Sequence, residues 1–194
     1  MFITIEGLDG AGLSTQAGLL RDYLLKKKKK VILTKEMTDG LVGGLIKAAL
    51  RKEWDTGNLT IQNLFTADRA HHLATEIEPA LKKGLIVVSD RYILSTLAYG
   101  ALDVPLQYLK QMNALFRKPD LTFILDVHPS ISLERIKASR YHVELFEVEQ
   151  KLHQIRKNYL ALKNYFGNTF VIDANNPKEK VFEDISKILD KKVY

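Results

Sequence analysis

Residues 7–14 have the sequence G-L-D-G-A-G-L-S. This stretch matches the phosphate-binding loop pattern G-x-x-x-x-G-K-[ST], except that Leu13 stands where the pattern has lysine. An apolar run over residues 2–5 precedes the loop, and a segment with leucines at helical spacing follows it. Strand, glycine loop and helix therefore come in the order that the motif requires. The alternative is an ordinary strand-to-helix turn that binds nothing.

The glycines of this loop suit it to phosphate binding. Glycine lets the backbone come close to a ligand, and the amides of the loop and of the helix N-terminus offer hydrogen-bond donors to an anion. The Ser14 hydroxyl is expected to ligate Mg²⁺. The predicted ATP-binding residues are Gly7, Leu8, Asp9, Gly10, Ala11, Gly12, Leu13, Ser14 and Thr15.

Length and composition favour one globular domain spanning residues 1–194. Hydrophobic residues make up 46% of the chain, and no apolar run is long enough to span a membrane. The sequence enters a strand directly, so we expect no signal peptide. The absence of cysteine excludes disulfides and thiolate metal sites, and we expect a cytoplasmic protein.

The net charge of +6 fits a polyanionic ligand. The lysine run at residues 26–30 raises the alternative of nucleic-acid binding. These lysines close a predicted helix, where cations complement the helix dipole, and no aromatic residues interleave with them. The pattern therefore favours a solvated helix end over a nucleic-acid partner.

Apolar runs alternate with helical segments along the chain. Strands are predicted at residues 2–5, 31–34, 85–88, 121–125 and 170–172, and helices at 41–50, 61–81, 105–116, 131–136, 146–165 and 181–189. Strands that are apolar on both faces are typical of a parallel sheet covered by helices. We predict an α/β protein with the three-layer P-loop fold, in which helices flank a five-stranded parallel sheet.

Three predicted strands end at an aspartate: Asp90, Asp126 and Asp173. Ligands of open parallel sheets bind at the carboxyl ends of the strands, near the loop. We favour a ligand role for Asp90, because Arg91 follows it, and a turn or cap role for Asp126 and Asp173.

Four further segments resemble the thymidylate kinase family of P-loop nucleoside monophosphate kinases. Residues 64–72, L-F-T-A-D-R-A-H-H, resemble that family's L-F-x-A-D-R-x-x-H helix, and residues 90–99 resemble its D-R-Y…S-x-x-A-Y segment. Residues 119–126 resemble its P-D-L-T strand, and residues 171–174 its last strand. The resemblance implies transfer of the γ-phosphoryl group of ATP to dTMP, with Mg²⁺, and a lid at about residues 137–147.

Phe65 and Arg69 lie four residues apart, on one face of a predicted helix. An aromatic ring can stack on a base and a guanidinium can bond its edge, and the resemblance implies these roles against thymine. Alone, Phe65 would more often be a core residue and Arg69 a solvated charge. The resemblance further implies that Arg91 grips the phosphate of dTMP and that Asp90 helps to hold Mg²⁺.

The resemblance places Asp9 near the sugar and phosphate of the acceptor and Tyr99 under the deoxyribose. The predicted dTMP-binding residues are Asp9, Glu36, Phe65, Arg69, Arg91, Ser95, Thr96 and Tyr99, and the predicted catalytic residues are Asp9, Arg91 and Arg140. His71 and His72 are adjacent and point about 100° apart on a helix, so no site role is assigned to them. The family also implies a homodimer, with the helices of residues 90–115 as its interface.

The departures from the family pattern concentrate on the phosphates. Leu13 replaces the loop lysine, and Leu145 stands where the lid arginine would fall. In the segment that resembles E-P-G-G-T, Glu36 and Gly40 are kept, whereas the proline is absent. Loss of a cationic clamp on a transferring phosphoryl group typically costs on the order of 10²–10⁵ in rate.

Two interpretations follow from these departures. The first is a thymidylate kinase with impaired transfer, in which Arg140, or else Lys137 or Arg156, replaces a missing cation. The second is a nucleotide-binding pseudoenzyme that keeps the dTMP pocket. We expect residue 13 to face the donor phosphates, so Leu13→Lys should speed transfer with little change in dTMP affinity. A related alternative is another nucleoside monophosphate kinase that acts on dUMP or on a deoxynucleoside.

Overall fold

Five parallel strands form the centre of the molecule, in the order β2-β3-β1-β4-β5. The computed structural model describes residues 1–139 and 149–193. The strands are β1 (Phe2–Gly7), β2 (Val31–Lys35), β3 (Ile86–Asp90), β4 (Leu121–Asp126) and β5 (Thr169–Asp173). The predicted five-stranded parallel sheet is confirmed.

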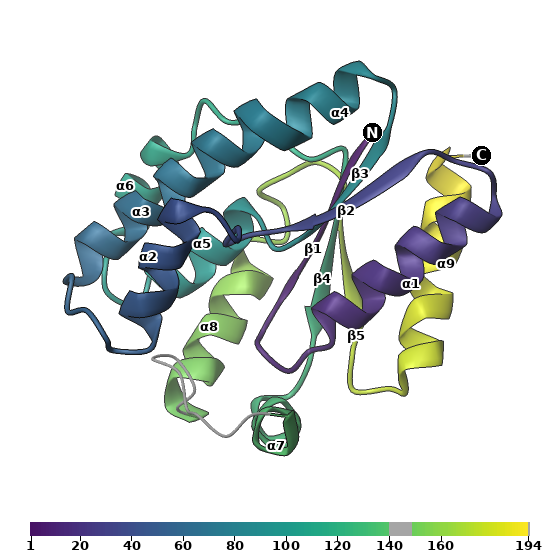
Figure 1. Ribbon diagram of the computed structural model, residues 1–194. Coiled ribbons are helices and arrows are strands. Elements are labelled where there is room, and N and C mark those ends of the chain that lie inside the picture. Colours follow the sequence, from purple (N-terminus) through teal and green to yellow (C-terminus); the bar gives the residue numbers. More distant parts are fainter. Residues whose placement is uncertain (140–148, 194) are drawn as a thin grey trace.

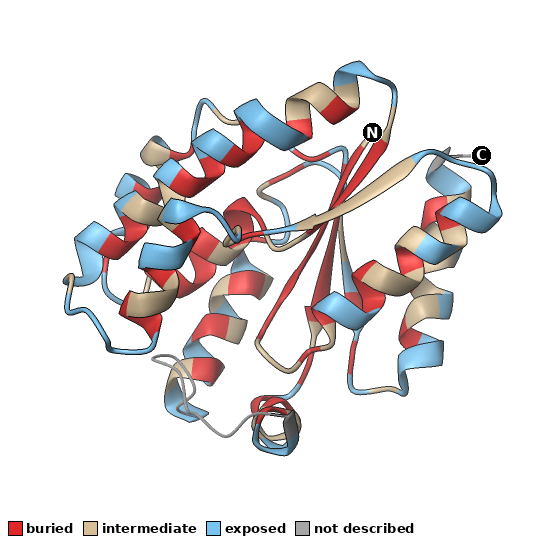
Figure 2. Ribbon diagram, in the orientation of Figure 1, coloured by how far each residue is buried: buried red, intermediate tan, exposed pale blue. Residues whose placement is uncertain are grey.

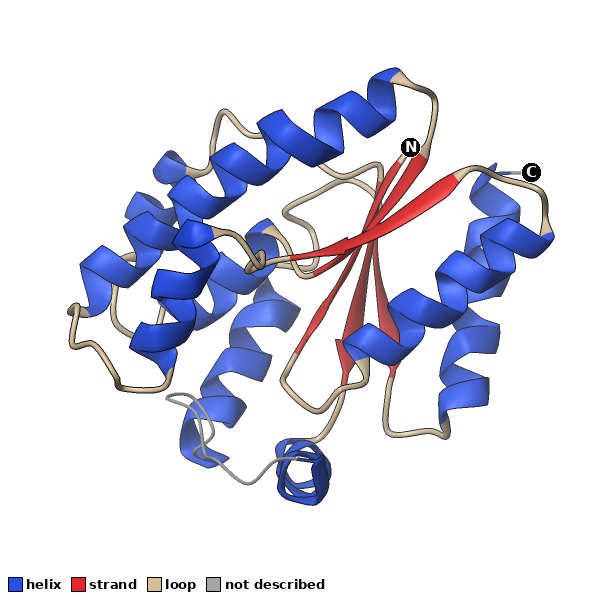
Figure 3. Ribbon diagram, in the orientation of Figure 1, coloured by secondary structure: helices blue, strands red, loops and turns tan. Residues whose placement is uncertain are grey.

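Helices cover both faces of this sheet. Figure 1 shows α1 and α9 on one side and α5 and α8 on the other, with α2, α3 and α6 packed beyond α5, and Figure 3 separates the layers by secondary structure. The three-layer α/β fold is therefore confirmed. The helices are α1 (Leu13–Lys26), α2 (Leu41–Leu50), α3 (Asn58–His72), the π-helical turn η1 (Leu73–Ile77), α4 (Glu78–Lys82), α5 (Ile93–Gly100), α6 (Leu106–Met112), α7 (Pro129–Ser139), α8 (Glu149–Ala161) and α9 (Lys178–Val193).

The central strands carry the core. Every residue of β1 is buried, and Figure 2 shows β1, β3 and β4 as a buried layer between the helices. Phe2, Ile3 and Phe123 are fully buried there. Complete burial of such a side chain contributes about 1.5–3 kcal/mol, so the apolar strand runs drive this arrangement. The edge strand β2 is only partly buried.

Five of the six predicted helices differ from the observed extents, and α7 and α9 extend beyond the predicted 131–136 and 181–189 at both ends. The predicted helix at 61–81 is one helical path that η1 interrupts, and α6 ends at Met112 rather than near residue 116. The end of α8 is Ala161, four residues before the predicted end. The bounds of α5 could not be read from the sequence, because a short helix that is buried on nearly every side has no amphipathic pattern.

The strand register brings the predicted ligand-binding ends together. Ile5 pairs with Asp90, Gly7 with Leu125, and Asp126 with Asp173. The glycine loop and the three strand-end aspartates therefore lie along one edge of the sheet, as predicted. Within the described residues, no helix is both long and apolar enough to cross a membrane.

Candidate active site

The glycine loop runs from β1 into α1 and is fixed by α7. Gly10 has φ +73°, and a Cβ at this position would lie 2.6 Å from the Ser132 carbonyl oxygen, so only glycine fits. The Ser132 hydroxyl donates to the Asp9 carbonyl over 2.6 Å. Gly12, with φ +91°, turns the chain into α1. Amides in the first turn of a helix have no acceptor within the helix, so those of Leu13 and Ser14 can donate to an anion.

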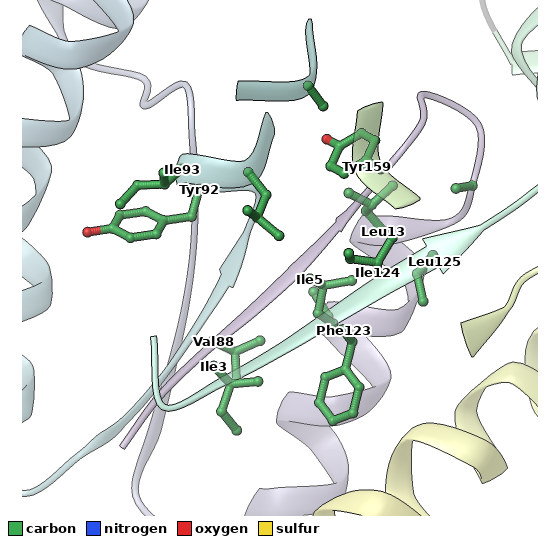
Figure 4. Close-up of a cluster of buried hydrophobic side chains, with 14 of the residues drawn as sticks. Ile3, Ile5, Leu13, Val88, Tyr92, Ile93, Phe123, Ile124, Leu125 and Tyr159 are labelled. Atoms are coloured by element: carbon green, nitrogen blue, oxygen red, sulfur yellow. The ribbon is translucent and has the colours of Figure 1, made fainter. Parts of the chain in front are cut away.

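The side chain of Leu13 does not face the phosphate side of this loop. It is only 5% exposed and belongs to the main hydrophobic core. Figure 4 shows it inside the cluster of buried side chains that includes Ile5, Ile124 and Tyr159. The expectation that residue 13 faces the donor phosphates is therefore wrong for this side chain. An apolar group gains free energy by leaving water, whereas a lysine there would have to project outward. A backbone role of Leu13 in ATP binding stays a prediction.

Ser14 and Asp90, the two residues predicted to bind Mg²⁺, lie in contact with each other. The Ser14 hydroxyl donates to a carboxylate oxygen of Asp90 at 2.5 Å. A hydroxyl and a carboxylate are the hard oxygen donors that Mg²⁺ prefers, with water and phosphate oxygens completing its shell. The described part of the chain holds no group of three or more histidine or acidic side chains arranged for a metal ion. This donor set thus fits Mg²⁺ bound together with a phosphate.

Arg91 occupies a strained position beside the loop. Its φ is +73°, which is unusual for a residue other than glycine, and such strain concentrates at functional sites. Its guanidinium donates to Asp9 Oδ1 at 2.8 Å, to the Gly7 carbonyl at 3.0 Å and to Ser95 Oγ at 3.1 Å. The strained turn thus aims a fixed positive charge at the space next to the glycine loop.

Tyr99 and Asp9 join the helix α5 to the loop. The Asp9 amide donates to the Tyr99 hydroxyl at 3.0 Å, and that hydroxyl donates to Asp9 Oδ2 at 3.0 Å. Burial, with the Asp9 carboxylate adding to it, raises the pKa of Tyr99 above its usual value. The hydroxyl therefore keeps its proton and holds Asp9 in place.

Arg69 is buried, so the alternative of a solvated charge is wrong. Its side chain is 1% exposed, and its Nε and one terminal nitrogen donate to Glu36 Oε2 at 2.9 and 2.6 Å. The guanidinium also donates to Thr96 Oγ1 at 2.9 Å and to Asn113 Oδ1. These bonds use four of the five N–H groups that a guanidinium carries. Within the described residues no hydrogen bond is given for the fifth N–H, so a ligand could accept it.

One pocket collects all the residues predicted to bind dTMP. It lies between the glycine loop, α3 and α5, and it is lined by Asp9, Glu36, Phe65, Arg69, Arg91, Ser95, Thr96 and Tyr99. Met37, Leu50, Gln62 and Tyr92 also line it, and the sequence analysis did not find them. Gln62 precedes Phe65 by one helical turn, so the spacing of α3 is the signal that could have found it.

Glu6 is a second residue that the sequence analysis missed. It is fully buried on β1 and accepts hydrogen bonds from Ser95 Oγ at 2.6 Å and from the Leu94 amide at 3.2 Å. Burial raises the pKa of its carboxyl to about 7, although the Ser95 bond and the Arg91 charge pull it down. Tyr159 of α8 completes the cluster, with its hydroxyl 2.8 Å from Ser95 Oγ. A carboxylate inside an apolar strand is the signal that could have identified Glu6 from the sequence.

Two arginines of the described residues, Arg135 and Arg156, lie on the other side of the loop from the pocket. Arg156 forms a two-pronged ion pair with Asp126, with N–O distances of 2.6 and 2.9 Å. The turn or cap role expected for Asp126 is therefore wrong, because α8 brings a distant arginine to it. Asp173 fits its expected role, since it accepts the Asn175 amide at 3.0 Å. Arg135, which the sequence analysis missed, donates to the carbonyls of Gly10 and Ala174.

The remaining donor-side predictions concern the lid. Lys137, at the end of α7, is exposed. Arg140 and Leu145 lie outside the described residues, so the lid and the catalytic role of Arg140 stay predictions.

A glycine loop beside an arginine-lined pocket, on a five-stranded parallel sheet, defines a P-loop nucleotide phosphotransferase fold. Comparison with known proteins narrows this class. A family model described as thymidylate kinase matches residues 5–185, and the chain belongs to the thymidylate kinase family. A protein of Pyrobaculum aerophilum named probable thymidylate kinase is 41% identical, with 99% of this chain and 97% of that protein aligned. A protein of Thermococcus gammatolerans with the same name is 37% identical, with 100% and 97% aligned.

Proposed function

We propose that this protein is a thymidylate kinase, which transfers the γ-phosphoryl group of ATP to dTMP and gives ADP and dTDP. The observation that carries the proposal is the single pocket that joins Phe65, Arg69, Arg91 and Tyr99 to Asp9 of the glycine loop. An aromatic face, a buried arginine and a second, phosphate-facing arginine suit a pyrimidine monophosphate.

The reaction needs little covalent chemistry from the protein. A phosphate oxygen of dTMP attacks the γ-phosphorus of ATP, and the bond to the bridging oxygen of ADP breaks. Arg91 neutralises the acceptor phosphate, which lowers its repulsion from the donor, and Asp9 keeps the guanidinium oriented. The loop amides hold the donor phosphates. When bound, Mg²⁺ would add positive charge there, and Ser14 and Asp90 are the residues that would hold it.

We further propose that transfer is slow compared with that of relatives that carry the loop lysine. The burial of Leu13 supports this part of the proposal, because no side-chain charge is supplied at that position. The same observation favours a second candidate, a nucleotide-binding pseudoenzyme. A coupled assay of ADP release at high enzyme concentration and several magnesium levels separates the two. Turnover of dTMP above a buffer control supports the kinase, whereas calorimetric dTMP binding without turnover supports the pseudoenzyme.

Specificity and assembly complete the proposal. Side-by-side titrations with dTMP, dUMP, UMP and CMP test whether thymine is preferred. Leu106, Tyr108 and Leu115 are exposed apolar side chains in the region predicted to form a homodimer, which sedimentation measurements can test. The homodimer and the cytoplasmic location stay predictions.

A further inference from the structure

His72 is the buried end of α3 and separates the acceptor pocket from a second cleft. Its side chain is 1% exposed. On one side, Nδ1 lies 3.3 Å from Glu36 Oε1. On the other, Nε2 lies 2.7 Å from Thr34 Oγ1. The family resemblance contained this histidine as the last residue of its helix motif, yet nothing in the proposed reaction uses it.

The two oxygens of the Glu36 carboxylate contact different partners, Arg69 and His72. Both bonds from Arg69 go to Oε2, whereas Oε1 is the oxygen beside His72. Glu36 follows the last residue of β2, so the regular strand does not fix its side chain. The contact of the imidazole with Oε1 therefore adds to the Arg69 bonds in opposing rotation of the carboxylate away from the guanidinium.

The outer side of His72 is anchored by the π-helical turn. This turn brings Glu76 Oε2 to 3.3 Å from Nε2, and the Thr34 hydroxyl donates to the same oxygen at 3.0 Å. π-helical turns are rare and occur often at functional sites. Thr34, His72 and Glu76 all line the outer cleft, whose volume is about 640 Å³. The outer contacts of the imidazole therefore border this cleft through the half-exposed Glu76, while its other side faces the buried Glu36.

The hydrogen-bond partners of His72 determine which ring nitrogen carries the hydrogen in the neutral imidazole. An ionised Glu36 can only accept, so Nδ1 must carry the hydrogen. In the neutral ring Nε2 accepts the single Thr34 proton, which then does not reach Glu76 Oε2; in the charged ring Nε2 donates to Thr34 Oγ1, and the Thr34 hydroxyl donates to Glu76 Oε2. Because Nδ1 donates to Glu36 in both forms, the contact with Glu36 does not depend on the charge of His72.

We propose that His72 is a positioning residue, which fixes the orientation of Glu36 and through it the guanidinium of Arg69 in the acceptor pocket. The consequence of this role for dTMP rests on the proposed function, whereas the effect on Arg69 does not.

Three variants of His72 separate its contact with Glu36 from its contact with Thr34. His72→Asn keeps a donor at the position of Nδ1, His72→Gln keeps a polar group only near Nε2, and His72→Leu removes both. The exposed neighbour variant His71→Asn is the matched control.

The first measurement uses the ligand-free protein. The solvent exchange of the Arg69 Nε–H is followed by NMR, with the signal assigned by its loss in Arg69→Lys. We expect slow exchange in the wild type, in His71→Asn and in His72→Asn. We expect at least about tenfold faster exchange in His72→Leu and His72→Gln, because one charged hydrogen bond of Glu36 is lost. Equal protection in His72→Leu and the wild type would overturn the inference, whether or not the protein turns over dTMP.

The second measurement is kinetic. In His72→Leu we expect the KM for dTMP to rise about tenfold, with kcat and the KM for ATP unchanged, and His72→Asn should restore it. A parallel rise of both KM values with a lower Tm would indicate a merely structural role and would count against the inference. If the wild type does not use dTMP at all, the proposed function fails, and the exchange measurement still decides the role of His72.

Discussion

Two parts of the candidate site differ in how their charges are held. The acceptor half is the pocket that contains Arg69 and Arg91, and the donor half is the glycine loop that contains Leu13. In the acceptor half, the two arginines each meet a carboxylate at hydrogen-bonding distance, Arg69 with Glu36 and Arg91 with Asp9. In the donor half, the loop residue that would carry a charge is Leu13, and it is packed into the core. Among the described residues, the predicted acceptor side thus holds two arginines in ion pairs, whereas the glycine loop itself offers backbone amides and no side-chain cation.

From this difference we infer that dTMP binding and phosphoryl transfer depend on separate parts of the fold. Under the proposed function, dTMP would be positioned by side chains that are bonded to one another, such as Arg69 with Glu36 and Arg91 with Asp9. Phosphoryl transfer depends on charges aimed at the moving group, and their loss leaves binding intact. Variants in the two halves should therefore change different kinetic constants.

The largest effect is expected at Arg91. In Arg91→Lys the charge remains, but the fork that bonds Asp9, Gly7 and Ser95 together is lost. We expect kcat/KM for dTMP to fall about 10³-fold in the ADP-release assay. Arg117→Lys is the control, because Arg117 forms a partly exposed pair with Glu78 and lies outside the pocket. A loss smaller than tenfold at Arg91 would mean that the acceptor half does not depend on this arginine.

Variants of two arginines, Arg140 and Arg156, test which cation serves the donor half. We predict from the sequence that Arg140 replaces a missing cation, so Arg140→Ala should lower kcat about 10²-fold and leave dTMP affinity unchanged. Arg156→Ala is the comparison, because Asp126 already neutralises the guanidinium of Arg156. We expect a smaller loss for it. The reverse order of the two effects would assign the donor charge to Arg156.

The raised pKa of Glu6, which contacts Ser95 of the acceptor pocket, predicts that the stability of the protein depends on pH. Burial raises the pKa of its carboxyl from the usual 4.5 to about 7 in the folded protein. The unfolded chain therefore releases this proton at a lower pH than the folded one does. Stability from this group is fully present below pH 4.5 and falls as the pH rises toward 7, by about 3 kcal/mol in all.

Glu6→Gln removes this titration. Urea unfolding at several pH values should show that the variant gains stability relative to the wild type between pH 4.5 and 7, and keeps that gain above pH 7. Glu53→Gln, at an exposed position, is the control. A stability difference between the wild type and Glu6→Gln that does not change with pH would show that Glu6 has an ordinary pKa.

The sequence predicted most of the acceptor half. Its residues occur in motifs with fixed spacing, and the strand ends at Asp90 and the helix face of Phe65 and Arg69 follow from that spacing. Predictions failed where a contact joins distant parts of the chain. Asp126 pairs with Arg156 across 30 positions, and Asn113 reaches Arg69 across 44. No local pattern specifies such pairs, because they depend on how α6 and α8 pack.

The burial of Leu13 shows a different reason for failure. The loop motif predicts the backbone path but not the direction of a side chain whose chemistry has changed. Lysine must stay near water or an anion, whereas leucine lowers its free energy by turning into the core. The same backbone position thus has two side-chain directions, and the residue type selects between them.

Leu13→Lys tests this selection directly. The lysine must leave the core, so we expect unfolding to become about 2 kcal/mol easier, from the lost burial and the space left behind. Because the ammonium would then reach the donor phosphates, we expect kcat to rise about tenfold while dTMP affinity stays the same. Leu13→Met is the control, since it nearly conserves volume and adds no charge, and it should change neither kcat nor stability much. An unchanged kcat in Leu13→Lys would mean that another cation already neutralises the donor phosphates. The donor half would then also have a side-chain cation, supplied from a position other than residue 13.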